Sequence, residues 1–277
     1  MSASLIAIVL FAACLHACWN AVVKGAGDKL LATILVSGMA GMLAACALPF
    51  LTPPAPPSWG FIAASALCQV GYYLLIANTY RIADMSQAYP LMRGSAPVFV
   101  ALASPWVIGE SLSPPAWAGI LLISGGIMAM IRGRGLNNRK GVWLALATAV
   151  VIAAYTLIDG IGVRRSAAPA AYTLWIFLLT AMVLLGWVLL ARRTAFVHYA
   201  RGNLHYGVIG GAGTLASYGI ALWAMTKAPV ALVAGLRETS ILFAVLIAVA
   251  VLKERVRRDQ WAMIALITAG AVLLRLA

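Results

Sequence analysis

Four ionisable side chains lie inside long apolar runs, where a charge is costly. They are Arg93, Asp159, Arg237 and Glu238. An arginine at the centre of a membrane helix costs about 2.5 kcal/mol or more, so such a residue is normally kept for a purpose. A guanidinium that faces a polar cavity can hold a carboxylate or a phosphate through two parallel hydrogen bonds. Arg93, Arg237 and Glu238 are therefore candidate substrate-binding residues.

The same four charges allow a second interpretation. Buried charges are usually paired, so the two arginines could neutralise Asp159 and Glu238 without touching a substrate. The two interpretations combine in a gate, in which an acid releases its arginine when substrate arrives. Asp159 and Glu238 are thus candidates for gating, and Glu238 is also a candidate for proton coupling.

Aromatic and amide side chains accompany these charges in the helices expected to line a cavity. Trp19, Tyr89, Tyr155 and Trp223 could stack on a substrate or on its cationic group, although packing or anchoring at the membrane interface is the alternative for each. Asn20 carries an amide that needs a partner inside a helix. The other aromatic residues of this group are Tyr72, Tyr73 and Tyr218.

Three further residues are candidates for gating or coupling. His16 could shuttle protons or bond a neighbouring helix. Pro90 and Pro97 bracket Arg93, and prolines loosen the backbone of a membrane helix. When the chain is aligned with itself so that Arg93 meets Arg237, Ile241 stands in place of Pro97. The two halves of the chain therefore need not form equivalent gates. No spacing of Cys, His or acidic residues predicts a metal site, and no cofactor is expected.

The composition indicates that the chain is embedded in a lipid bilayer. The chain has 277 residues, of which 64% are hydrophobic and 10% charged, whereas a soluble domain is about half apolar and roughly a quarter charged. The net charge of +13 does not indicate nucleic acid, because the basic residues stand in the gaps between apolar runs. Long apolar runs in a lipid bilayer form helices, because every backbone polar group must be satisfied internally.

The apolar runs predict an all-α membrane protein with ten transmembrane helices. The expected spans are 3–23, 30–50, 58–79, 86–108, 114–131, 141–163, 170–190, 204–226, 229–252 and 258–276. Turns alone separate them, which leaves no room for a soluble domain.

The chain repeats itself. Sliding it so that Arg93 meets Arg237 also brings Glu110 onto Glu254 and Trp117 onto Trp261. Each half, 1–135 and 136–277, holds five helices, and an odd number makes the halves enter the membrane in opposite directions. Secondary transporters with such inverted repeats bind substrate near the midplane, where the halves meet. Glu110 and Glu254, at helix ends, are interpreted as structural, and Ser113 followed by Pro114 predicts a helix cap.

The loops also predict an orientation. One set of loops carries most of the basic residues, which places that set in the cytoplasm and both termini on the other side. The residues of this set are Lys24, Lys29, Arg81, Arg132, Arg134, Arg139, Lys140, Arg192, Arg193, Arg201, Lys253, Arg255, Arg257 and Arg258. We expect the protein to lie in a bacterial-type inner membrane.

Two segments give the pattern a name. GESLSPPAWAGILLISGG (109–126) and KERVRRDQWAMIALITAG (253–270), together with LHACWNAVVK near the start, resemble the EamA-type drug/metabolite transporters. The resemblance covers essentially the whole chain. It implies a transporter of amino acids, other metabolites or drugs.

The sequence therefore predicts a secondary transporter that exports small polar metabolites across the inner membrane by alternating access. Amino acids are the preferred substrates, because arginines suit the carboxylate and acids suit the amine. The alternatives are a multidrug or lipophilic cation exporter and a non-transporting membrane scaffold. No set of nucleophile and base indicates an enzyme. Apart from lipid and substrate no partner is expected, and a monomer suffices because one chain holds both halves.

Overall fold

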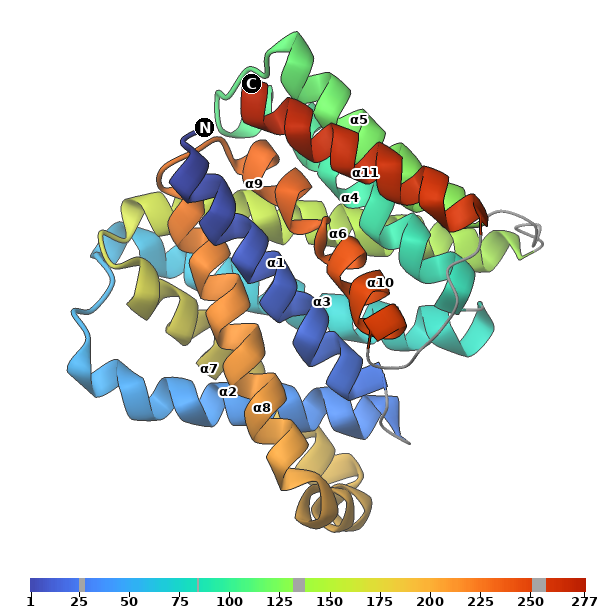
Figure 1. Ribbon diagram of the computed structural model, residues 1–277. Coiled ribbons are helices and arrows are strands. Elements are labelled where there is room, and N and C mark those ends of the chain that lie inside the picture. The colour runs from blue at the N-terminus through green and yellow to red at the C-terminus, as the bar shows by residue number, and fades with distance from the viewer. Residues whose placement is uncertain (25–27, 84, 132–137, 251–257) are drawn as a thin grey trace.

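The computed structural model describes residues 1–24, 28–83, 85–131, 138–250 and 258–277, and within these ranges the chain is helical with no strand (Figure 1). Glu254 lies outside the described residues, as do the loop residues Arg132, Arg134, Lys253, Arg255 and Arg257.

The long helices follow the predicted spans in order. They are α1 (Ala3–Lys24), α2 (Lys29–Ala47), α3 (Trp59–Ile82), α4 (Met85–Val107), α5 (Pro114–Met128), α6 (Arg139–Arg165), α7 (Pro169–Ala191), α8 (Arg193–Met225), α9 (Val230–Arg237), α10 (Ser240–Ala250) and α11 (Arg258–Leu276). Short 3₁₀ turns, η1 (Leu48–Phe50), η2 (Pro56–Ser58) and η3 (Ala129–Ile131), flank α2, α3 and α5.

Seven helical segments among the described residues are long and apolar enough to cross a membrane. They include α9 and α10 together over Val230–Ile247, whereas α5 and residues 261–276 of α11 are shorter apolar helices. The all-helical class of the fold is confirmed, and the count of ten spans stays a prediction.

Side-chain caps begin several helices where the sequence predicts a start. The Ser113 hydroxyl accepts a hydrogen bond from the backbone N–H of Ala116 at 3.4 Å, with Pro114 as the first helical residue. Asn138 caps α6 in the same way and also donates to the Ile82 carbonyl at 2.7 Å, which ties the start of α6 to the end of α3. Both caps satisfy backbone groups that a helix end leaves open. The cap predicted at Ser113 is confirmed.

α8 is bent near its beginning. Asn203 leaves the helical conformation, with φ −126° and ψ 17°, so the residues before it form a separate helical arm that is visible at the lower end of α8 (Figure 1). The predicted span 204–226 begins directly after this bend. The arm, residues 193–202, carries loop arginines and was not predicted as a helix.

The helix contacts are equivalent when the two repeats are exchanged. α1 packs on α8 as α6 packs on α3, and α1 packs on α10 as α6 packs on α4. In two further contacts a helix packs on its own equivalent in the other repeat, namely α2 on α7 and α5 on α11. Figure 1 shows α5 and α11 running side by side. Most of these contacts join one repeat to the other, so the repeats are interlocked.

Glycines allow the closest of these approaches. A Cβ atom placed on Gly270 would stand 2.6 Å from the Gly119 carbonyl oxygen, and one on Gly119 would stand 2.9 Å from the Gly270 carbonyl oxygen. The backbones of α5 and α11 are thus in direct contact. Gly211 approaches α2 similarly, because a Cβ there would stand 2.8 Å from the Ala40 nitrogen. Small residues let membrane helices approach in this way.

The ninth predicted span is broken in its middle. α9 ends at Arg237, and α10 begins at Ser240. Around the break the backbone bonds join residues three apart, as in Glu238 N–H to Gly235 and Ile241 N–H to Glu238. A 3₁₀ stretch inside a helix often marks a functional hinge.

The counterpart of this span in the first repeat, α4, is a single helix through Pro90, Pro97 and Pro105. The halves do differ, as the missing second proline predicts. However, the interruption falls in the repeat without the proline, where the Thr239 hydroxyl donates to the Leu236 carbonyl at 2.6 Å and so stabilises the tight turn.

Candidate functional site

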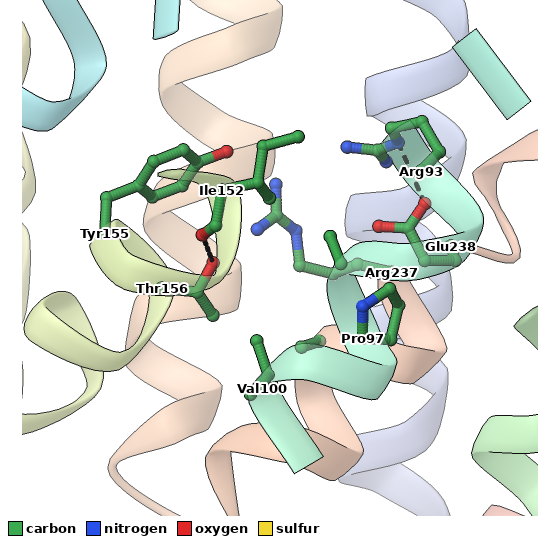
Figure 2. A pocket seen from close by; sticks show the side chains of 10 residues that line it. Arg93, Pro97, Val100, Ile152, Tyr155, Thr156, Arg237 and Glu238 are labelled. Carbon is green, nitrogen blue, oxygen red and sulfur yellow. Dashed lines mark hydrogen bonds and ion pairs between the residues drawn. The ribbon is translucent and has the colours of Figure 1, made fainter. Parts of the chain in front are cut away.

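A small polar pocket lies between α4, α6 and α9, where the two repeats meet (Figure 2). Its space has room for about one water molecule, so side chains fill most of the site. The lining residues are Arg93, Ala96, Pro97, Val100, Ile152, Tyr155, Thr156, Ala234, Arg237 and Glu238.

The break in the ninth span explains how two neighbouring charges reach one pocket. Adjacent residues of a regular α-helix point about 100° apart. Arg237 ends α9 and Glu238 lies in the tight turn after it, and both line the pocket. Figure 2 shows them diverging within it, with Arg237 extending toward Tyr155 and Glu238 toward Arg93.

Arg93 and Glu238 form an ion pair across the repeats. The Arg93 Nε and the Glu238 Oε2 are 2.8 Å apart, and the two side chains are 9% and 7% exposed. The pairing that the sequence left open therefore exists for these two residues. The Nη2 of Arg93 is buried and has no hydrogen-bond partner among the described residues, so the guanidinium keeps a free donor beside the pocket.

Asp159 is held by phenols. It is fully buried on α6 and accepts hydrogen bonds from Tyr172 Oη at 3.0 Å and from Tyr218 Oη at 2.5 Å. No arginine or lysine nitrogen of the described chain lies within 4.0 Å of its carboxylate. An ion pair of Asp159 with Arg237, which the pairing interpretation allows, is therefore not formed there.

Arg237 rests instead on an aromatic ring. Its guanidinium carbon lies 4.8 Å from the centroid of the Tyr218 ring. Within the part of the chain that the structure describes, no carboxylate lies within 4.0 Å of this guanidinium. Arg237 is partly buried and lines the pocket. It therefore presents to the pocket a positive charge that no carboxylate of the described residues contacts.

The predicted aromatic residues divide into two groups. Tyr155 lines the pocket, and its ring packs edgewise on Tyr218 and Tyr72, with centroids 6.3 and 6.1 Å away. Tyr89 is partly buried on α4, one turn before Arg93. By contrast, Trp223 is 39% exposed and does not line the pocket, so the structure does not bring it to the site.

Three of the predicted residues lie on α1. The ring of His16 packs edgewise on Trp19, with centroids 5.3 Å apart. The Trp19 indole N–H is buried and has no partner among the described residues. The Asn20 amide donates to the His16 carbonyl at 2.8 Å, within its own helix. On α4, Pro97 lines the pocket, and Pro90 is buried about two turns earlier in the helix.

Sequence reasoning missed two residues. Tyr172 has no charge or motif near it that signals its bond to Asp159. Arg164 directly follows the predicted span 141–163 and was assigned no role at the site. No cluster of three or more His, Cys, Asp or Glu that could hold a metal is present in the described ranges.

Arg164 belongs to a clasp at one end of the bundle, formed with Glu110. The Arg164 Nη2 lies 2.6 Å from Glu110 Oε1, and the other Glu110 oxygen accepts from the Val230 N–H at 2.8 Å. Arg164 also donates to the carbonyls of Met225 and Ala228, at 2.7 and 2.9 Å. The Glu110–Arg164 clasp thus joins the α4–α5 turn to α6 and to the start of α9.

Replacing Glu110 by alanine is expected to lower the free energy of unfolding by about 1–2 kcal/mol. The variant leaves the Val230 N–H without an acceptor and removes the ion pair, which is partly exposed and therefore screened by solvent. Denaturant unfolding in mixed micelles measures the loss. Glu110→Gln keeps the acceptor for Val230 and should lose less; an equal loss in both variants would contradict this account.

The fold and the pocket define a multi-pass membrane protein whose polar site lies between two helical repeats. The chain belongs to the EamA-like transporter family, whose model matches residues 3–132 and 139–276. It is thus a membrane transporter of the drug/metabolite transporter superfamily, as the resemblance in its sequence predicts.

A solved structure has a similar fold. A chain described only as "Crystal structure of protein" aligns with a TM-score of 0.78 at 21% identity, covering 100% of this chain and 99% of its own length. That likeness concerns the fold alone. No curated protein matches the chain.

Proposed function

We propose that this protein is a secondary transporter that exports small polar metabolites by alternating access, with amino acids as its preferred substrates. The observation that carries the proposal is Arg237. Its guanidinium faces a pocket between the repeats and contacts an aromatic ring, with no carboxylate of the described residues within 4.0 Å. A charge in such a place is costly unless it is paired. The carboxylate of a substrate would pair with it bidentately.

The other end of an amino acid suits the other charges of the pocket. A substrate ammonium would compete with Arg93 for the Glu238 carboxylate, which lies 2.8 Å from Arg93. Loosening this pair would weaken the contact between α4 and the break that follows α9. In this proposal Arg93, Glu238 and Tyr155 contact the substrate, while Asp159, His16 and the prolines of α4 serve the gate.

The small size of the pocket supports a mechanism with a conformational change. Room for about one water molecule does not admit an amino acid, so substrate entry requires the repeats to move apart on one side. The Glu110–Arg164 clasp holds the end of the bundle at which α4 and α6 stop. By the distribution of basic residues this end is the non-cytoplasmic one. We place the protein in the inner membrane as a monomer.

Counterflow in proteoliposomes tests the proposal. Vesicles are loaded with a panel of unlabelled amino acids, and entry of the matching labelled amino acid is followed. Wild type should exchange at least one of them, and Arg237→Gln should lower the rate at low substrate concentration by about tenfold or more, as expected for loss of a charged hydrogen-bond partner.

Arg275→Gln is the matched control, because Arg275 is an exposed residue near the end of α11. It should transport like wild type. If wild type moves no amino acid, the assignment of substrate is wrong, and a panel of lipophilic cations comes next. If neither panel moves and the variants alter only stability, the protein is a scaffold rather than a transporter.

A further inference from the structure

Tyr218 connects two charges that do not touch each other. It lies on α8 and is 7% exposed. Its hydroxyl donates to Asp159 on α6 at 2.5 Å, while its ring carries the guanidinium of Arg237, at the end of α9, at 4.8 Å. A cation over an aromatic face is attracted by the ring electrons, and more strongly where water is excluded.

Tyr218 stands between Arg237 and Asp159 in the network of contacts. Both oxygens of Asp159 already accept phenol hydrogen bonds, one from Tyr172 and one from Tyr218. The carboxylate of Asp159 is thus held by the two phenols, and the ring of Tyr218 is the contact of the Arg237 guanidinium. A ring contact uses the π electrons and no N–H donor, so the donors of Arg237 stay available.

The ring of Tyr218 is itself fixed. Phe177 on α7 and Tyr155 on α6 pack edgewise against it, with centroids 6.0 and 6.3 Å away. The adjacent Ser217 donates to the Ala12 carbonyl of α1 at 2.8 Å, which ties this part of α8 to the bundle. Arg237 therefore rests on a rigid support, and a positioned group loses less freedom when it binds a ligand.

From these contacts we propose that Tyr218 positions Arg237 as the group that recognises the substrate carboxylate. The protein then prefers a molecule with a carboxylate over the same molecule with a carboxamide. This inference rests on the proposed function and adds to it the part of the substrate that is recognised and the residue that sets the preference. Tyr218 acts through Arg237 and is a positioning residue.

Two substitutions separate the two contacts of Tyr218. Tyr218→Phe keeps the ring under Arg237 and removes the donor to Asp159. Tyr218→Gln removes the ring and leaves an amide N–H donor on a shorter side chain. Tyr172→Phe is the matched control, since it removes the same kind of hydrogen bond from Asp159 at 3.0 Å while the ring contact of Arg237 is made by Tyr218.

The experiment measures KM and maximal rate for an amino acid and for its amide, by counterflow with the full-length protein. Wild type should prefer the amino acid. Tyr218→Gln should raise the KM of the amino acid about tenfold and leave that of the amide nearly unchanged, so that the preference is lost. Tyr218→Phe and Tyr172→Phe should keep the preference.

Equal changes for acid and amide in Tyr218→Gln, or a fall in maximal rate alone, would show a merely structural role and overturn the inference. If Arg237→Gln loses the preference while Tyr218→Gln keeps it, the proposed function stands and the positioning role falls. If wild type transports neither compound, the proposed function itself fails. Should Tyr218→Gln not fold, Tyr218→Leu is compared with Tyr218→Phe instead, because both lack the hydroxyl and only Phe keeps the ring under Arg237.

Discussion

Arg93→Gln is expected to lower the free energy of unfolding by about 3–5 kcal/mol, because it leaves the Glu238 carboxylate as an uncompensated buried charge. Glu238→Gln should cost a similar amount for the opposite reason. The Arg93 Nε and the Glu238 Oε2 are 2.8 Å apart, and both side chains are almost completely buried. Solvent therefore screens the attraction between the two charges little. Denaturant unfolding in mixed micelles, with each variant at matched detergent, gives the values.

The double variant Arg93→Gln/Glu238→Gln is the decisive control. With both charges gone, neither is left unpaired, and the double variant should be more stable than either single variant. Losses that simply add would show that the two residues are not coupled, and the ion pair would then carry no stability. Transport by the double variant, measured beside its stability, separates a structural pair from a pair that also meets the substrate.

Gly270→Ala is expected to destabilise the protein by about 1–3 kcal/mol or to prevent its folding. The added methyl group would stand 2.6 Å from the Gly119 carbonyl oxygen and 3.0 Å from the Ile123 nitrogen. Both contacts are backbone atoms, which cannot turn aside as a flexible side chain could, so α5 and α11 would have to separate. The midpoint of thermal unfolding, followed by light scattering in detergent, measures the effect.

Gly125→Ala provides the contrast on the same helix pair. A Cβ atom at Gly125 meets nothing within 4 Å, and alanine is a better helix former than glycine by about 0.8–1.0 kcal/mol. This variant should therefore be as stable as wild type or slightly more stable. Equal losses at Gly125 and Gly270 would mean that glycine is needed for another reason than the close approach of the helices.

The sequence predicted the helices well because lipid leaves the backbone no alternative to internal hydrogen bonding. It also singled out the pocket charges, since Arg93 and Arg237 are conspicuous in apolar runs and occupy matching places in the repeat. The ring contact of Arg237 was harder to predict, because Tyr218 lies on α8 and reaches Asp159 of α6 only where these two helices pack.

The orientation of individual side chains was the weakest part of the prediction. In a soluble protein the outward face of a helix is polar, but in a membrane bundle the lipid-facing side is as apolar as the interior. The sequence of α8 therefore does not show which face is inside. Tyr218 and Trp223 stand five positions apart, on different faces; the structure buries Tyr218 and leaves Trp223 39% exposed.

The close contact of α5 with α11 has a consequence for how the chain is made. α11 is synthesised a full repeat after α5, and the helix against which the Gly119 backbone packs is therefore absent while the second repeat is being inserted. Any factor that shields unassembled helices in the membrane would meet α5 in this interval. The first repeat is completed by a helix of the second, so the two repeats reach their folded state together rather than one after the other.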